Sequence, residues 1–320
     1  MTAPSPTAGL HHVTALASDA QRNLDFYAGI LGLRLVKRTV NFDDPGTYHL
    51  YYGDALGRPG TLLTFFPIDG ARSGRSGPGQ ATAVAFAVPE GALGFWMERL
   101  IGHGVRFDGP ARRFGEAVLR LADPDGTPIE LVFVRGLGAA EAFPGATVPP
   151  EAAIHRLHGV TLTERDDRGT RAFLTGMPGF RPLGQDGELT RFGSVGGSGV
   201  VDVRTVPGAP WAAPGAGTIH HVALRADDLA HQSALAEALR RQGTPATTVR
   251  DRRYFHSVYL REPGGVLFEI ATDLPGFARD EAPERLGEML MLPPELEVMR
   301  TELERDLPPL HLPGAAATEA

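Results

Sequence analysis

The sequence predicts an α+β fold in which four βαβββ modules pair into two domains with open, mixed-sheet barrels. Short apolar strands recur four times, about 60 to 75 residues apart, and a helical stretch follows each of them. Each unit then closes with a further strand after a glycine-containing turn. This spacing is long for a solenoid repeat and suits a module of one helix and four strands.

Each module is expected to open with an apolar strand and continue into a helix. The leading strands are Leu10–Leu16, Thr82–Val88, Leu157–Leu162 and Ile219–Arg225. The helical stretches begin near Asp19, Glu90, Asp167 and Asp227. Asp19 and Asp227 are the expected N-caps of the first and last helix, because a short acidic side chain accepts hydrogen bonds from the first turn. Gly32 and Gly243 are expected just past the C-terminal ends.

The closing strands and the linker complete the predicted organisation. The closing strands are Thr61–Phe66, Thr127–Val134, Val200–Thr205 and Val266–Ala271. A Gly/Ala/Pro-rich stretch at 136–150 is the natural linker, so the expected domains are residues 1–145 and 146–320, with two modules in each. Residues after about Leu312 are expected to form a disordered tail.

Composition excludes several kinds of chemistry. The 320 residues include no cysteine and eleven histidines, so thiolate metal sites, iron–sulfur clusters and cysteine nucleophiles are excluded. The formal net charge is −7, and the densest basic stretch, Arg250–Arg253, contains an aspartate, so we expect no nucleic-acid partner. No signal peptide and no membrane-spanning run are visible, so the expected location is the cytoplasm.

Two adjacent-histidine pairs are the most specific feature. His11-His12 opens the first module, and His220-His221 opens the fourth. Neighbouring residues of a strand point to opposite faces, so only one histidine of each pair can reach a given site. Thr14 shares the face of His12, whereas the residues that alternate with His11 and His220 are apolar. We therefore expect His12 and His221 at the site and their neighbours behind them.

The closing strands supply the acidic residues. When the modules are aligned on their turns, the position of Glu269 holds Glu130 in the second module and Thr64 in the first, and Asp202 falls there by a looser alignment in the third. We call this the acid position. A carboxylate inside an apolar strand is costly to bury unless it is paired or binds a metal. An arginine-paired buried acid is the competing interpretation of Glu269.

Counting ligands for each pairing of modules identifies one complete set. Modules one and two together give His12 and Glu130, and modules three and four give His221, Glu269 and, by the looser alignment, Asp202. Only modules one and four give two histidines and one carboxylate. This facial triad is typical of non-haem Fe(II) enzymes, and Mn(II) accepts the same ligands. The sequence therefore predicts a site shared between the first and last modules.

Three other histidines have weaker claims. His49 lies on an alternating strand and is either near the site or a buried histidine of the sheet. His256 precedes the closing strand of the fourth module and could reach a substrate. His158 aligns with His11 rather than with His12, which favours a structural role.

Longer motifs resemble a known family. The chain resembles the vicinal oxygen chelate superfamily over His11-His12-Val13-Thr14, Phe26-Tyr27 and Leu31–Val40. This superfamily includes glyoxalase I, bleomycin-resistance proteins and extradiol dioxygenases. The ring-cleaving dioxygenases that act on hydroquinones resemble the chain more narrowly over Tyr48–Tyr52, Pro59–Thr61, Tyr254-Phe255 and Pro263–Glu269. The resemblance spans about residues 8 to 310, and it implies two glyoxalase-like domains.

The resemblance also implies roles for particular residues. In that subfamily Fe(II) is held at the positions of His12, His221 and Glu269. Residues that support the ligands or contact the substrate fall on His11, His220, Arg252 and Tyr259. The family has a glycine where this chain has Arg253, so the sequence allows either arginine to face the site. The implied activity is ring cleavage of a hydroquinone-like or catechol-like diol by dioxygen.

Two other functions stay open on the sequence alone. A glyoxalase-like metal-dependent lyase or isomerase would use a second carboxylate, with His221, Glu269 and Asp202 as ligands. A metal-free binding protein of the resistance type would lack the ligand residues altogether. The expected partners are a small aromatic diol and dioxygen, with no membrane, and a homo-oligomer is compatible with the sequence.

Overall fold

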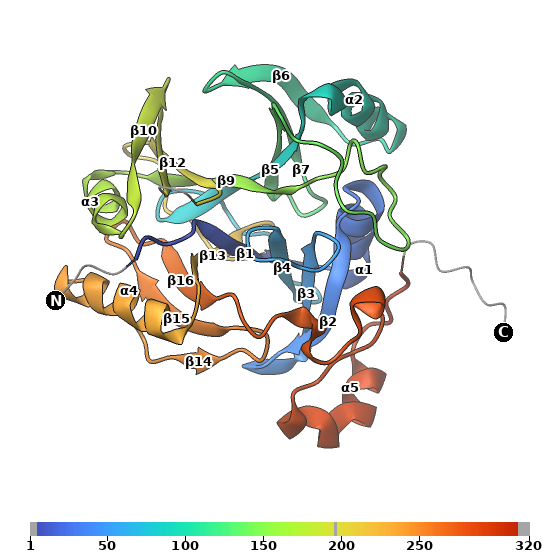
Figure 1. Ribbon diagram of the computed structural model, residues 1–320. Helices are drawn as coiled ribbons and strands as arrows, with labels where there is room; N and C mark the ends of the chain where they lie inside the picture. The colour runs from blue at the N-terminus through green and yellow to red at the C-terminus, as the bar shows by residue number, and fades with distance from the viewer. Residues whose placement is uncertain (1–4, 195–196, 313–320) are drawn as a thin grey trace.

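The computed structural model describes residues 5–194 and 197–312, and these form two eight-stranded mixed sheets. The first, which we call the site sheet, has the strand order β14-β15-β16-β13-β1-β4-β3-β2. The second sheet has the order β10-β11-β12-β9-β5-β8-β7-β6. Both sheets curl, and they lie one above the other, with α1 and α2 on one side and α3 and α4 on the other (Figure 1). The predicted α+β class and the open, mixed sheets are confirmed.

Each predicted module is present and follows the same chain order. The first contains β1 Leu10–Ala17, α1 Ala20–Leu24, a π-helical turn Asp25–Ile30, β2 Arg34–Asn41, β3 Asp44–Gly53 and β4 Leu62–Pro67. The second contains β5 Gln80–Pro89, a 3₁₀ turn Glu90–Ala92, α2 Leu93–Gly102, β6 Phe107–Arg113, β7 Glu116–Ala122 and β8 Pro128–Val134. The third contains β9 Arg156–Glu164, α3 Arg168–Gly176, β10 Phe180–Asp186, β11 Leu189–Ser194 and β12 Val200–Thr205. The fourth contains β13 Ile219–Ala226, α4 Leu229–Arg241, β14 Arg250–Asp251, β15 His256–Arg261 and β16 Leu267–Thr272.

A C-terminal strap follows the last module. It contains the 3₁₀ turns Phe277–Arg279, Pro283–Arg285 and Pro294–Met299, and it ends in α5 Arg300–Asp306. The disordered tail predicted after about Leu312 lies outside the described residues.

The sheets do not follow the two halves of the sequence. Leading strands β1 and β13 pair antiparallel, which joins modules one and four, and β5 and β9 pair in the same way to join modules two and three. Each sheet therefore takes one module from each side of the predicted boundary at residues 145 and 146. The pairing of modules one and four is the one that the ligand count favoured, whereas the division into residues 1–145 and 146–320 stays a prediction.

The helices of the first and fourth modules are bounded by capping residues at both ends. Asp19 accepts a hydrogen bond from the backbone N–H of Arg22, as an N-cap should. The N-cap of α4 is Asp228 rather than the predicted Asp227, because Asp228 is the residue that is extended and accepts from the His231 N–H at 2.8 Å. Gly32 and Gly243 both have positive φ just past the helix ends, as predicted.

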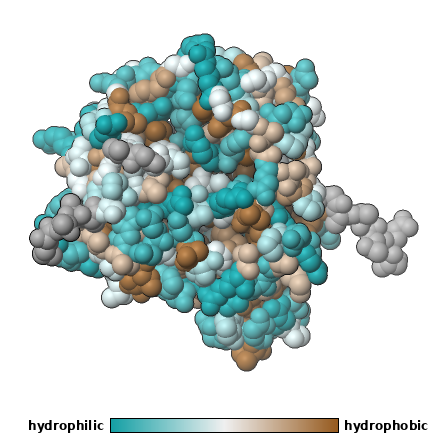
Figure 2. Space-filling model, viewed as in Figure 1, coloured by the Kyte–Doolittle hydropathy of each residue, from teal (hydrophilic) through white to brown (hydrophobic). Residues whose placement is uncertain are grey.

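The surface mixes polar and apolar side chains. Hydrophilic residues cover most of the visible face, and hydrophobic residues form small separate patches (Figure 2). Within the described ranges, no helix has the length and apolar character that a membrane crossing requires.

Candidate metal centre

Three side chains from modules one and four converge at the centre of the site sheet. His12 Nε2 lies 3.2 Å from His221 Nε2 and 3.5 Å from Glu269 Oε2, and His221 Nε2 lies 2.9 Å from the same oxygen. All three residues are buried. Among the described residues they form the one group of three or more potential metal ligands whose ligand atoms lie within 4.8 Å of one another. The structure thus brings together the three residues that the ligand count selected.

The strand register explains why these three positions meet. In every module, the residue two positions after the histidine position pairs with the acid position of the closing strand. The four pairs are Thr14 with Thr64, Ala85 with Glu130, Thr161 with Asp202, and Ala223 with Glu269. The predicted acid position is therefore equivalent in all four modules, including the third. Side chains two residues apart on a strand share a face, so the acid position and the histidine position face the same side of each sheet.

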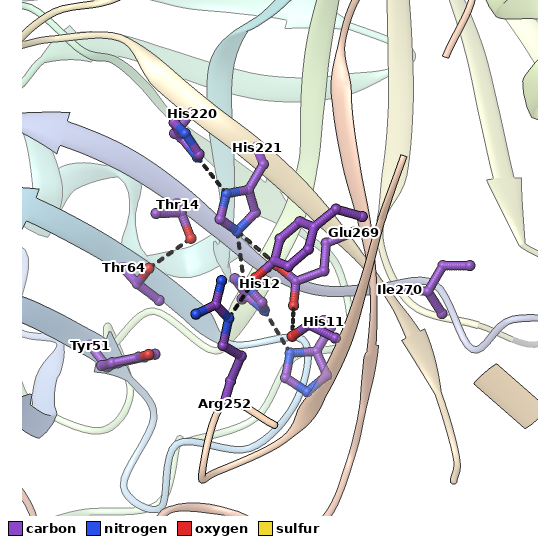
Figure 3. A network of polar contacts seen from close by, with 12 residues as sticks. His11, His12, Thr14, Tyr51, Thr64, His220, His221, Arg252, Glu269 and Ile270 are labelled. Carbon is purple, nitrogen blue, oxygen red and sulfur yellow. Dashed lines mark hydrogen bonds and ion pairs between the residues drawn. The ribbon is translucent and has the colours of Figure 1, made fainter. Parts of the chain in front are cut away.

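The neighbouring histidines hold the rings of His12 and His221. His11 Nδ1 lies 2.9 Å from His12 Nδ1, and its Nε2 lies 3.2 Å from the carbonyl oxygen of Thr272. His220 Nδ1 lies 2.8 Å from His221 Nδ1. The four imidazoles form a row from His220 through His221 and His12 to His11 (Figure 3). Because a carbonyl only accepts, neutral His11 carries its proton on Nε2 and accepts from His12 Nδ1, which leaves His12 Nε2 with a lone pair.

Glu269 is held by one oxygen and offers the other. Ser257 Oγ donates to Glu269 Oε1 at 2.5 Å, whereas Oε2 is buried and accepts no hydrogen bond from the described residues. Burial raises the pKa of Glu269, but the facing His12 and His221 outweigh it and hold this pKa well below its usual value. Burial lowers the pKa of His11 to about 3 and that of His220 to about 4, so both rings are neutral near pH 7.

These residues fit a divalent metal. Nitrogen and oxygen ligands bind such ions at about 2.0 to 2.2 Å, and three ligands at right angles around the ion lie about 3.0 Å apart. The observed separations are 3.2, 3.5 and 2.9 Å. The unpartnered Glu269 Oε2 also needs a positively charged neighbour, since a buried charge without one is costly. Two imidazoles and one carboxylate are the facial set that Fe(II) and Mn(II) accept.

A cavity of about 380 Å³ opens onto the three ligands. Arg252 and Tyr259 line it, and Arg252 Nε donates to the Tyr259 hydroxyl at 3.2 Å. Burial raises the pKa of Tyr259 well above its ordinary value, so the phenol stays protonated. Arg252 also pairs with Asp43 at 2.9 Å. Arg253 lies away from the cavity and pairs with Asp280 at 2.8 Å, so Arg252 is the arginine that faces the site.

Of the three other candidate histidines, only His49 lines the cavity. His49 lines the cavity, and its ring bonds Tyr51 Oη at 2.8 Å and Thr64 Oγ1 at 3.0 Å. His256 does not line the cavity, and His158 lies in the second sheet against Glu116. The expectation that His256 could reach a substrate is therefore not supported by its position.

Several residues of the site escaped the sequence analysis. Ser257 was missed, although it shares the strand face of Tyr259 two residues later, which was the available signal. The aromatic walls were also missed because they come from three separate segments of the chain. They are Phe42, Phe66 and Phe255.

The remaining acids belong to another environment. Asp202 lies in the second sheet and binds Arg191 through two hydrogen bonds of 2.8 and 2.9 Å. The alternative ligand set of His221, Glu269 and Asp202 is therefore wrong, because its members lie in different sheets. Glu130 also lies in the second sheet and pairs with Arg113 through both carboxylate oxygens.

Comparisons with known proteins match the chain to one superfamily and to relatives along almost its whole length. The model of the Glyoxalase/Bleomycin resistance protein/Dioxygenase superfamily matches residues 9–131 and 156–270. MhqO of Bacillus subtilis (strain 168), whose name assigns it to the ring-cleaving dioxygenases, is 45% identical over 96% of this chain and 97% of its own. The chlorohydroquinone/hydroquinone 1,2-dioxygenase of Sphingobium indicum is 38% identical over 96% of this chain and 98% of its own.

Solved structures show the same fold. A Bacillus subtilis protein assigned as a dioxygenase superposes with a TM-score of 0.90 at 43% identity, over 96% of this chain and 99% of its own. Glyoxalase I from Zea mays superposes with a TM-score of 0.61 at 16% identity, over 82% of this chain and 92% of its own, and shares the fold alone. The chain therefore belongs to the glyoxalase/bleomycin resistance protein/dioxygenase superfamily.

Proposed function

We propose that the chain is a non-haem Fe(II)-dependent dioxygenase that cleaves the ring of a hydroquinone-like or catechol-like diol. His12, His221 and Glu269 would hold the iron, and Mn(II) is the other metal that this ligand set accepts. One observation carries the proposal: two imidazole Nε2 atoms and one carboxylate oxygen converge at a cavity with aromatic walls. The name of the Sphingobium indicum relative supports the reaction class.

The cavity suits a flat aromatic molecule. Its walls include Phe42, Phe66, Phe255 and Tyr51, and aromatic rings pack well against one another with offset or edge contacts. Its volume is about 380 Å³. A cavity of about 150 Å³ is enough for benzene, so there is room for a monocyclic diol beside the three ligands.

The charges of the site favour an ionised diol. When bound, the metal supplies the redox chemistry that lets dioxygen react with the ring. With two neutral histidines and one carboxylate, the loaded site carries a net charge of about +1, which lowers the pKa of a bound phenol. Arg252, which also pairs with Asp43, places a guanidinium at the cavity, and the protonated hydroxyl of Tyr259 can donate to a developing oxyanion.

The outer histidines have distinct roles in this proposal. His11 fixes the ring of His12 through the Thr272 carbonyl, which makes it a positioning residue. If His221 binds through Nε2, its Nδ1 donates to His220, and neutral His220 then carries its proton on Nε2. His220 lines the cavity, so it offers an N–H donor to a substrate oxygen.

Anaerobic metal loading followed by oxygen-uptake measurements tests the proposal. We expect the protein to retain about one Fe(II) per chain and to consume oxygen with hydroquinone or catechol. Uptake with catechol alone would change the substrate and leave the class intact. A metal-loaded protein that consumes no oxygen with any diol would instead favour a lyase or isomerase, and a protein that retains no metal would favour a binding function.

A further inference from the structure

A second cavity of about 360 Å³ adjoins the first at the fourth module's histidine pair. The two cavities share Leu16, His220 and His221 in their walls. The ring of His220 extends away from the converging ligands on the far side of His221 (Figure 3). A molecule bound beside the ligands in the first cavity would therefore meet the second cavity at His220.

The walls of the second cavity are mainly apolar. Trp211 is 51% exposed, which is unusual for so large an aromatic side chain and leaves its surface available to a ligand. Apart from the two histidines, Arg261 is the one ionisable residue among the described residues that line this cavity. The apolar part of the wall also includes Pro78, Ala81, Pro214, Ile219, Val266 and Leu267.

This wall is fixed in place before any ligand binds. The segment that carries Trp211 pairs with the segment after β4, and Arg75 and Ala213 exchange both backbone hydrogen bonds at 2.8 Å. The side chain of Arg75 donates to the Trp211 carbonyl at 2.9 Å, and the guanidinium of Arg165 lies 4.5 Å from the centre of a Trp211 ring. A preformed wall reduces the conformational entropy that the protein loses when a ligand binds.

Gln80 leaves an unused hydrogen-bond acceptor at this cavity. Its amide Nε2 donates to the Ile219 carbonyl at 2.7 Å, which fixes the orientation of the amide. Its Oε1 is buried and has no partner among the described residues, although Gln80 lines the cavity. Buried acceptors are rarely left unpaired, so a water molecule is expected there.

We propose that the second cavity is a subsite for an apolar aryl or alkyl substituent on the ring of the diol. The ring would occupy the first cavity beside the three ligands, and the substituent would pass His220 and contact Trp211. The inference rests on the proposed function for the identity of the ring. It deepens that function by naming the substrate class: diols with a sizeable apolar substituent, as well as simple ones.

Tryptophan fluorescence tests the subsite without any turnover. The chain has two tryptophans, and Trp96 is fully buried in α2, so a change on ligand binding reports on Trp211. The metal-loaded protein would be titrated anaerobically with phenylhydroquinone and with hydroquinone. We expect a saturable change with phenylhydroquinone that is absent in Trp211→Phe, which also corrects for light absorbed by the ligand. Equal changes in both proteins, or equal changes with both ligands, would overturn the subsite.

A cavity-filling substitution gives the kinetic test. Ala212 is half-buried and lines the second cavity but not the first, so Ala212→Phe should block the second cavity. We expect KM for phenylhydroquinone to rise at least about tenfold, while KM for hydroquinone changes less than about twofold. Ala209→Phe is the matched control, because Ala209 is also half-buried and lines neither cavity. A parallel rise for both substrates, or no rise, would overturn the subsite.

The two tests separate failure of the subsite from failure of the proposed function. If the wild-type protein consumes no oxygen with any diol, the dioxygenase proposal fails, and the fluorescence titration still decides whether phenylhydroquinone reaches Trp211. If oxygen is consumed but neither test distinguishes phenylhydroquinone from hydroquinone, only the subsite fails.

Discussion

The site sheet and the second sheet share one plan and differ at a few equivalent positions. The site sheet has His12 and His221 where the second sheet has Ala83 and Gly159. A side chain at Gly159 would collide with the neighbouring strand, since an added Cβ would lie 2.7 Å from the Val200 carbonyl oxygen. The backbone of the second sheet thus leaves no room for the second histidine.

The cross-strand partners of the acid position differ in the same systematic way. In the second sheet each acid faces an arginine on the neighbouring strand, whereas in the site sheet the partner is a tyrosine. The pairs are Arg120 with Glu130, Arg191 with Asp202, Tyr51 with Thr64, and Tyr259 with Glu269.

This difference shows how one scaffold gives two outcomes for a buried acid. In the second sheet, Arg113 and Arg191 neutralise Glu130 and Asp202 permanently, so no carboxylate oxygen is available to a cation. In the site sheet the neighbours of Glu269 are neutral or titratable, and its Oε2 has no hydrogen-bond donor among the described residues. A metal would give Glu269 a permanent positive partner, whereas without a metal only the titratable His12 and His221 face its carboxylate.

The largest expected effect comes from removing the acid of the site sheet. Glu269→Ala and His12→Ala should each lose iron, and activity should fall at least about a thousandfold, which corresponds to about 4 kcal/mol. Glu130→Ala removes the equivalent acid of the second sheet and should keep its iron. Metal analysis after anaerobic loading and oxygen uptake measure both. Full iron occupancy in Glu269→Ala would show that the acid of the site sheet is not an iron ligand, and the proposed difference between the two sheets would be wrong.

The second prediction concerns stability, where Glu130→Ala should have the larger effect and Glu269→Ala the smaller one. Glu130→Ala removes the bidentate partner of buried Arg113 and leaves only Asp202, at 3.9 Å, as a close carboxylate, and breaking such a buried pair costs about 3 to 5 kcal/mol. In metal-free protein, Glu269→Ala removes a buried charge that faces titratable histidines rather than a permanently charged arginine, so we expect a smaller loss of unfolding free energy. Urea denaturation of both metal-free variants measures the difference. A larger loss in Glu269→Ala would show that Glu269 is itself a stabilising residue.

The sequence predicted the ligands because strand parity and module alignment are local properties. His12 and His221 follow from alternation on single strands, and Glu269 follows from its place after a turn. The choice between Arg252 and Arg253 was not available, because it depends on the left-handed φ of +66° at Arg253 and on Asp280 in the C-terminal strap.

The sheet pairing was visible only indirectly. Pairing β1 with β13 joins residues that are about 200 positions apart, and the sequence of neither strand indicates which strand it pairs with. The ligand count favoured modules one and four because only that pairing completes a triad. The arginines of the second sheet were not predicted as partners of Glu130 and Asp202, because those contacts depend on the register of neighbouring strands.

The third prediction concerns the residue behind His12. His11→Phe keeps a ring but removes the Nδ1 acceptor of His12, so we expect iron affinity to fall about 10- to 100-fold. His158→Phe is the matched control, because His158 is buried in the second sheet at the position aligned with His11. Competition with a metal chelator measures the affinity. Equal losses in both variants would mean that His11 acts only through packing.

The smallest expected effect is the dependence of stability on pH. Burial lowers the pKa of His11 to about 3 in the folded protein, below the usual value of 6.5. Between these values the unfolded chain binds more protons than the folded chain. The unfolding free energy of metal-free protein should therefore fall as the pH falls through this window, by at most about 1.4 kcal/mol per pH unit for this residue.

Urea unfolding of metal-free protein at pH 7, 6 and 5 measures this slope. His11→Phe should flatten it, because phenylalanine binds no proton, whereas His158→Phe should retain the part that His11 contributes. Burial also lowers the pKa of His220 to about 4, so a slope of the same sign should remain in His11→Phe. If His11→Phe and wild type had the same slope, folding would leave the pKa of His11 at its usual value of 6.5, and His11 would be protonated in the folded state below that pH. It would then be unable to accept the Nδ1 proton of His12, and the difference between the sheets would rest on His12, His221 and Glu269 alone.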